Sequence, residues 1–135
     1  MVGNLSCRNS NSLHNVIHHI VFEVSDLARA AAFYDALLSP LGWRRHVNET
    51  NAIGYGISRP ILFITERTSV RSEGTMVSLG APGIAAVKAA WEGGTGSGGS
   101  NVARPGETSA HGSGSYSAFL RDPDGHDIEV TVSQD

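Results

Sequence analysis

Glu129 is a carboxylate within an otherwise apolar strand, and an enclosed carboxylate can take up protons or bind cations. Segment 127–132 alternates between two faces, as a strand does. Its apolar face holds Ile128, Val130 and Val132, and its other face holds Asp127, Glu129 and Thr131. Strand periodicity therefore directs Glu129 away from the apolar row, toward either solvent or a lined cavity.

The strand with Glu129 is the second half of a hairpin over residues 116–132. Its turn reads Asp122-Pro123-Asp124-Gly125, in which proline presets φ, aspartate caps and glycine tolerates the exit conformation. Arg121 adjoins Asp122, and we expect a solvated ion pair there. Arg59, Arg104 and Arg121 are the arginines that an anionic substrate would contact.

The first half of the chain predicts one strand, one helix and three further strands. The helix covers 27–38, with Ser25 or Asp26 as its N-cap and with Pro40 and Gly42 ending it. The strands are β-branched or aromatic segments at 16–24, 43–47, 51–57 and 61–65.

The second half predicts the same order. A strand at 75–79 precedes a helix at 84–91, which Gly93 and Gly94 should stop. We expect a flexible glycine-rich loop at 93–100, a weak strand at 101–104, and another loop at 105–114 before the closing hairpin.

The two halves form an internal repeat. At an offset of 57, His19 corresponds to Met76 and the first helix corresponds to the second; at an offset of 66, Phe63 corresponds to Glu129. The fold class is therefore α+β, with two β-α-β-β-β modules at 17–66 and 75–132 in one domain over 17–132. Neither four-stranded sheet can bury both faces with one helix, so a partner sheet or a ligand must cover the second face.

The segments HIVFEVSDLARAAAFYDALLSPLGW and YSAFLRDPDGHDIEV resemble the glyoxalase / bleomycin-resistance / extradiol dioxygenase superfamily, also called vicinal oxygen chelate proteins. The resemblance implies a cupped mixed sheet with the helices outside and a small-molecule cavity inside. It also implies a homodimer. Metal-using members bring up to four side chains into the cavity, from the first and last strands of each module.

By the repeat, those four positions are His19, Phe63, Met76 and Glu129. His19 and Glu129 match the ligand types of the family and would bind Zn, Ni, Mn or Fe, or would transfer protons as a pair. Phe63 and Met76 do not match, and catalytic metals usually keep three protein ligands. The two mismatches favour a metal-free binding protein over a glyoxalase-type lyase or isomerase.

Other residues extend this site or belong to the core. His46, His111 and His126 are further candidate metal ligands. Pocket walls for an apolar or aromatic ligand would come from Trp43, Tyr55, Phe63, Met76 and Tyr116. Residues of these types are more often simply core.

Composition sets the remaining expectations. Lys plus Arg is 10 and Asp plus Glu is 13, a net charge of −3 that gives no basic footprint for nucleic acid. Cys7 is the single cysteine, so no internal disulfide forms, and no apolar run reaches the length of a membrane span. Residues 1–16 are Asn- and Ser-rich without the pattern of a signal peptide, which predicts a mobile tail and a cytoplasmic protein.

Overall fold

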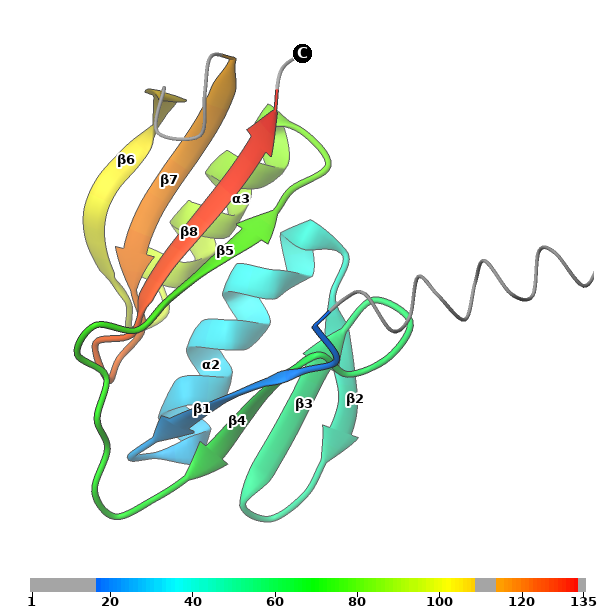
Figure 1. The fold of residues 1–135 in the computed structure, drawn as a ribbon, viewed down its shortest axis with the longest axis vertical. Coiled ribbons are helices and arrows are strands. Elements are labelled where there is room, and N and C mark those ends of the chain that lie inside the picture. The colour runs from blue at the N-terminus through cyan, green and yellow to red at the C-terminus, as the bar shows by residue number, and fades with distance from the viewer. Residues whose placement is uncertain (1–16, 109–113, 134–135) are drawn as a thin grey trace, which may run out of the picture.

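The computed structural model describes residues 17–108 and 114–133 and shows two β-α-β-β-β modules (Figure 1). Module one comprises β1 (Ile20–Val24), α2 (Leu27–Leu38), the 3-10 helix η1 (Ser39–Leu41), β2 (Arg44–Asn48), β3 (Ala52–Gly56) and β4 (Leu62–Glu66). Module two comprises β5 (Met76–Gly80), α3 (Ile84–Thr95), β6 (Ser100–Thr108), β7 (Ser115–Arg121) and β8 (Asp127–Ser133). The predicted fold class is confirmed.

Each module forms its own four-stranded mixed sheet, and the two sheets have the same topology. The strand orders are β1-β4-β3-β2 and β5-β8-β7-β6, with one parallel pair in each, β1 with β4 and β5 with β8. Val21 lies opposite Phe63 in one pair, and Ser78 lies opposite Glu129 in the other. These pairs are related by the offsets of 57 and 66, so the predicted repeat is confirmed at the level of strand register.

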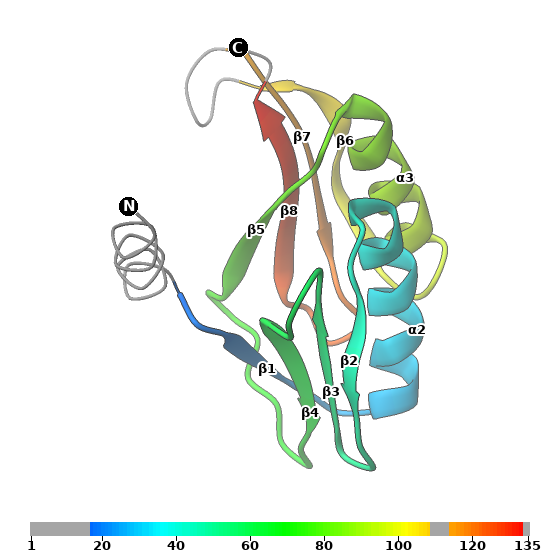
Figure 2. The same ribbon diagram turned by 90° about the vertical axis from the view of Figure 1, so that its right-hand side faces the viewer.

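Both helices lie on the same side of the two sheets, as Figure 2 shows in side view. The buried core lies between the helices and the sheets, and its strand residues come from alternate positions such as Leu62, Ile64, Ile128 and Val130, none of which is exposed. We call the opposite sheet surfaces, which face away from α2 and α3, the open face. A helix layer on one side only therefore leaves the open face for other contacts.

The helix α3 does not stop at Gly93 and Gly94 as the sequence predicts, but continues to Thr95. The two glycines instead allow close packing. A Cβ on Gly93 would lie 2.5 Å from the carbonyl oxygen of Ala36 in α2, and one on Gly94 would lie 2.6 Å from Leu120 Cδ1. The loop predicted at 93–100 is therefore shorter, because residues 93–95 belong to α3 and Ser100 begins β6, which leaves a turn at 96–99.

The strand β6 is also longer than predicted. It spans nine residues and pairs with β7 from Ser100 to Thr108, where a short strand and a loop were expected. Register shifts interrupt the ladder between Ala103 and Gly106, around Pro105. Proline has no N–H to donate, and an irregular edge strand tolerates it. The rest of the predicted loop, at 109–113, lies outside the described residues.

The predicted tail at 1–16 lies outside the described residues. Within residues 17–108 and 114–133, no helix is long and apolar enough to cross a membrane.

Replacing Gly93 with alanine tests the contact between α2 and α3. Alanine normally stabilises a helix interior by about 1 kcal/mol relative to glycine. Here the new methyl would strike the backbone of Ala36, so we expect a net loss of about 1–3 kcal/mol in the free energy of unfolding, measured by urea denaturation. Gly80→Ala is the control, because no atom lies within 4 Å of its Cβ position. Equal stabilities for the two variants would contradict close packing at Gly93.

Candidate functional site

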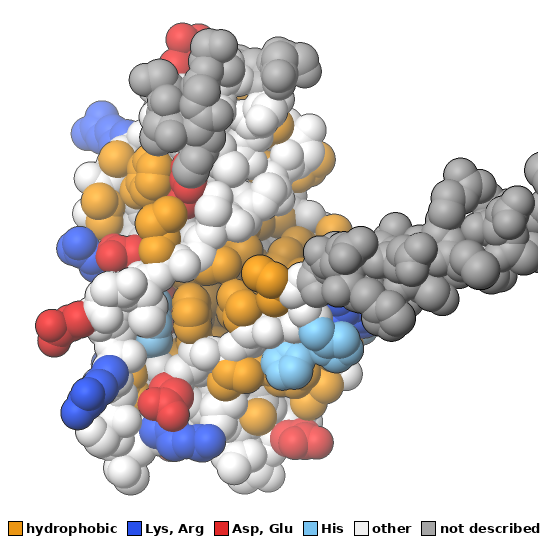
Figure 3. Space-filling model, in the orientation of Figure 1, with side chains coloured by type: hydrophobic (Ala, Val, Ile, Leu, Met, Phe, Trp, Pro, Cys, Tyr) orange, Lys and Arg blue, Asp and Glu red, His pale blue; other side chains and the backbone are white. Residues whose placement is uncertain are grey.

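The open face carries the residues at the four repeat-related positions of the candidate site. In module one, the register of β1 and β4 places the side chains of Val21, Phe63 and Thr65 on this face. Ser78 and Glu129 belong to its module-two part through the register of β5 and β8. Figure 3, which looks onto this face, shows hydrophobic side chains gathered in the middle, where the two sheets meet.

Glu129 lies on the open face yet has no exposed surface. It is opposite Phe119 in the antiparallel pair of β7 and β8, so the two side chains project from the same face. Its neighbours Ile128 and Val130 point the other way, into the core. The strand alternation is as the sequence predicts, and Glu129 is buried rather than exposed to solvent.

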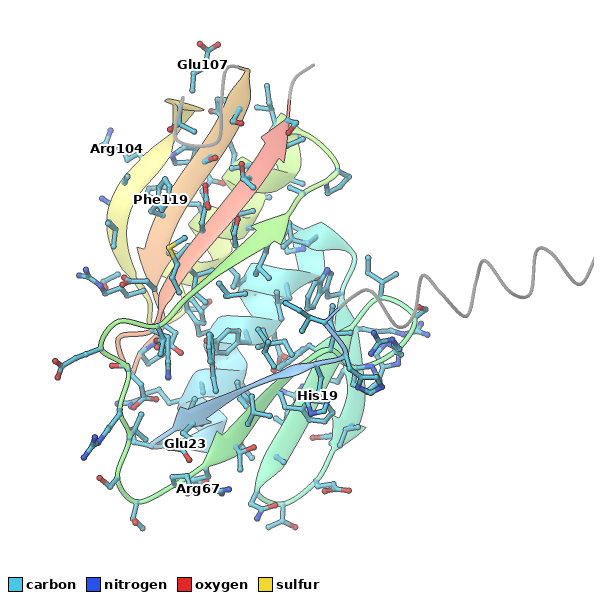
Figure 4. All side chains as sticks on the ribbon, in the orientation of Figure 1. His19, Glu23, Arg67, Arg104, Glu107 and Phe119 are labelled. Atoms are coloured by element: carbon cyan, nitrogen blue, oxygen red, sulfur yellow. The ribbon has the colours of Figure 1, made fainter. Side chains whose placement is uncertain are left out.

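His19 lies just before β1 and is exposed. Its ring contacts that of Phe63 edge to face, at 5.5 Å between centroids and an interplanar angle of 72°. Its Nδ1 lies 2.9 Å from Nδ1 of His18. Figure 4 shows His19 on module one and Phe119 on module two. The two modules therefore each present one polar candidate, His19 and Glu129, beside an aromatic ring.

The donor set does not fit a catalytic metal. Phe63 has no donor atom, and Met76 exposes 56% of its surface and offers only a thioether. Within the described residues, no three His, Cys, Asp or Glu side chains come together as a metal site would require. His19 and Glu129 thus remain two candidate ligands without a third from the described residues of the chain.

The other candidate histidines lie elsewhere. His46 Nε2 contacts the carbonyl oxygens of Gly56 and Ile57, each at 3.1 Å, which ties β2 to the end of β3. His126 is 1% exposed and contacts Asp122 through Nδ1. His111 lies outside the described residues.

The remaining predicted pocket residues do not share one surface. Tyr55 is 1% exposed on the helix side of its sheet, and its hydroxyl donates to Asp35 Oδ1 at 2.9 Å. Tyr116 is also on the helix side and packs against the core. Trp43 is partly buried and lines a pocket of about 210 Å³ between the modules. Only Phe63 and Met76 accompany His19 and Glu129 on the open face.

That pocket lies between the first strands of the two modules. Ile20 and Leu62 line it from module one, and Val77 and Leu79 line it from module two. Its walls are mostly apolar, which agrees with the hydrophobic patch visible in Figure 3. By strand alternation these four side chains belong to the helix side of the sheets, so the pocket belongs to the junction between the modules and not to the open face.

The candidate arginines are engaged in local contacts or stand at an edge. Arg59 donates to the carbonyl oxygen of His18 at 2.6 Å. Arg121 pairs with Asp127 at 2.8 Å, so the predicted pair with Asp122 is wrong. Arg104 is exposed on β6 (Figure 4).

Asp122 is instead the centre of a buried polar cluster that the sequence did not predict. Its Oδ2 accepts from the Tyr34 hydroxyl at 2.6 Å and lies 2.7 Å from His126 Nδ1. Its Oδ1 accepts from the N–H groups of Asp124 and His126, both at 2.9 Å. The ring of His126 stacks on Phe22 at 4.4 Å and 6°. We call Phe22, Tyr34, Asp122 and His126 the Asp122 cluster.

Two groups in the cluster titrate abnormally. Burial raises the pKa of Tyr34 well above its ordinary value, and the charge of Asp122 raises it further. Burial acts to raise the pKa of Asp122 as well, but hydrogen bonds from His126 and Tyr34 more than offset it and hold the pKa below the ordinary value. Asp122 is therefore a buried carboxylate stabilised as the anion by its donors.

Comparison with known proteins agrees with this geometry. Residues 16–130 match the sequence model of the family described as Glyoxalase/Bleomycin resistance protein/Dioxygenase superfamily. No protein of curated function matches the chain.

Several solved structures share the fold. A glyoxalase/bleomycin resistance protein from Albidiferax ferrireducens T118 is 28% identical, with 84% of this chain and 96% of that chain covered and a TM-score of 0.76. The hypothetical protein SA1046 from S. aureus is 25% identical, with coverages of 84% and 94% and a TM-score of 0.65. The fosfomycin resistance protein FosX from Mesorhizobium loti is 16% identical, with coverages of 88% and 92% and a TM-score of 0.66, and shows the fold alone.

The Asp122 cluster predicts how stability depends on pH. Because the pKa of Asp122 is lowered by folding, its contribution is present above its unfolded pKa of about 4 and is lost as the pH falls through the folded pKa. The raised pKa of Tyr34 gives a contribution that is present below about pH 10 and is lost at higher pH. Urea midpoints should therefore fall at both extremes. Asp122→Asn should flatten the acid side and Tyr34→Phe the alkaline side, and unchanged slopes would contradict these assignments.

Proposed function

Because the chain belongs to the Glyoxalase/Bleomycin resistance protein/Dioxygenase superfamily, we propose that it binds a small organic molecule on its open face without a metal ion. The name of the relative from Albidiferax ferrireducens, a glyoxalase/bleomycin resistance protein, supports a role in capturing such a compound. The observation that carries the proposal is the composition of the four repeat-related positions. Two are polar, His19 and Glu129, and two are apolar, Phe63 and Met76.

The chemistry of these side chains suits recognition of a mixed polar and aromatic ligand. Phe63 and Phe119 offer ring surface on the two modules, and both are partly exposed. The Glu129 carboxylate would accept a hydrogen bond from a donor group on a ligand that displaces its present surroundings, and a charge-assisted hydrogen bond of this kind is worth about 1.5–3 kcal/mol. His19 is an exposed imidazole that can donate or accept. Apolar walls with a few placed polar groups are typical of small-molecule sites.

A metal-dependent lyase or isomerase is the alternative, favoured by the retention of an imidazole and a carboxylate at two of the four positions. Such an enzyme needs a third protein donor. Elemental analysis of freshly purified protein tests it. Stoichiometric Zn, Ni, Mn or Fe would support the enzyme and contradict the metal-free proposal.

We also propose that a second copy of the chain covers the open face. Val21 exposes 53% of its surface and Met76 exposes 56%, and both lie on this face beside the junction of the sheets. In such a homodimer, one cavity would combine module one of one chain with module two of the other. His19 and Glu129 would then face a common ligand from different chains.

Glu129→Gln tests the ligand site, with bleomycin and a collection of small aromatic and oxygenated fragments as probes. We expect calorimetric titration of the wild-type protein to give binding, and the loss of the carboxylate charge to weaken it by about tenfold or more, equivalent to about 1.4 kcal/mol. His19→Ala should weaken binding as well. Glu92→Gln is the matched control, since Glu92 is an exposed carboxylate on α3. Equal affinities for all four proteins would contradict an open-face site.

Val21→Glu tests the dimer. A carboxylate in the middle of an apolar interface is costly to desolvate, so we expect the variant to sediment as a monomer where the wild-type protein sediments as a dimer. Ile84→Glu is the control, because Ile84 is 37% exposed at the start of α3, in the helix layer away from the open face. A monomeric wild-type protein, or an unaffected Val21→Glu dimer, would refute this interface.

A further inference from the structure

The hairpin turn between β7 and β8 of module two contacts module one at the junction of β1 and α2. Asp124 in the turn accepts from the N–H and the Oγ of Ser25, at 3.1 and 2.6 Å, and lies 3.3 Å from Arg29 Nη2. Beside it, Asp122 accepts from Tyr34 in α2 at 2.6 Å. A turn that closes a hairpin in one module is thus hydrogen-bonded to the helix of the other.

The two carboxylate oxygens of Asp122 have different roles. Oδ1 accepts from two backbone N–H groups within the turn, so it maintains the local conformation of module two. Oδ2 accepts from the Tyr34 hydroxyl, so it connects the turn to module one. Both residues are buried, at 3% and 0% exposure, where a charge-assisted hydrogen bond is stronger than at the surface.

The cluster also reaches the strands that carry the candidate site. His126 directly precedes β8, in which Glu129 lies three residues further on. Its ring stacks on Phe22, which adjoins Val21 in β1. The cluster therefore contacts β1 and the start of β8 from the helix side, while the candidate residues project from the other side.

Within residues 17–108 and 114–133, the side-chain hydrogen bonds between the two modules converge on Asp122 and Asp124. Their sheets are separate, since β1 and β5 are end strands in two different strand orders. The contact between α2 and α3 is one of packing, with Gly93 against the backbone of Ala36 and Gly94 against Phe33 and Leu37, and packed helices can shift by small sliding movements. Hydrogen bonds to a buried carboxylate permit much less displacement, because they weaken steeply with angle.

We propose that the Asp122 cluster is a positioning device that sets the orientation of module two on module one, and with it the placement of β8 relative to β1. Tyr34 and Asp122 act across the modules, and His126 transmits the position of the turn to Phe22. The proposal concerns the geometry of the chain itself and holds whether or not the open face binds a ligand.

Tyr34→Phe tests the proposal by removing one hydroxyl, with Tyr55→Phe as the matched control. Both hydroxyls donate to a carboxylate from a buried ring, but Tyr55 and Asp35 belong to the same module. Backbone residual dipolar couplings of the full chain report relative orientation directly. One alignment tensor should fit both modules of the wild-type protein and of Tyr55→Phe. In Tyr34→Phe the couplings within each module should still fit the structure of that module. The couplings of the two modules together should no longer fit one alignment tensor when the modules are held in their wild-type relative orientation.

Asp122→Asn provides a second variant. Its side-chain oxygen can still accept the two N–H groups of the turn, but its amide nitrogen cannot accept from Tyr34 and can only donate to the hydroxyl oxygen, in a neutral hydrogen bond that is weaker than the charge-assisted one. We expect the same loss of common orientation, with the His126 amide still protected from hydrogen exchange. If the couplings of Tyr34→Phe and Asp122→Asn fit the wild-type orientation as well as those of Tyr55→Phe do, the cluster has no positioning role. The measurements need no ligand, so failure of the small-molecule proposal would leave their outcome unaffected.

Discussion

Each sheet has two faces and each module, in the part of the chain that the structure describes, has one α-helix, and the rest of the structure follows from that imbalance. An apolar sheet face must be removed from water, and α2 and α3 do so on one side only. Alternation along the strands sends Ile64 and Val130 to the covered side and Phe63 and Glu129 to the open side. The open face is thus a consequence of the repeat, and its residues are free to differ between the two modules.

The difference between the modules is what gives the open face its chemical character. Where module one has Phe63, module two has Glu129, and where module one has His19, module two has Met76. The repeat gives equivalent positions in the two modules, and each module has one ionisable group beside a phenylalanine ring: His19 beside Phe63 and Glu129 beside Phe119. A surface of this kind recognises a ligand with both aromatic and polar parts more readily than it assembles a metal site.

The sequence predicted the fold well because its signals are local and periodic. The helix at 27–38, the alternation of the last strand and the Asp122–Gly125 turn follow from spacing, capping and turn chemistry. Its failures involve long-range packing. Sequence alone predicts that Gly93 and Gly94 end the helix. The tertiary structure shows that α2 and Leu120 lie so close to them that a larger residue is excluded.

The candidate site was predictable only in part, for a related reason. Strand phase and the repeat placed His19, Phe63, Met76 and Glu129 on one face, but they could not separate them from Tyr55 and Tyr116, which the structure places on the helix side. The Asp122 cluster was missed because its hydrogen bond between the modules joins Tyr34 to Asp122, which are 88 residues apart in the sequence. Contacts between modules leave no periodic signal within either one.

Metal-free binding on the open face is tested most directly by a chemical-shift map of metal-free protein titrated with the compound that binds best among bleomycin and the fragments. We expect the largest shifts on amides of the open-face strands, at Val21, Phe63, Ser78 and Glu129, with no requirement for added metal. Shifts confined to α2 and α3, or binding that appears only after Zn, Ni, Mn or Fe is added, would contradict a metal-free site on this face.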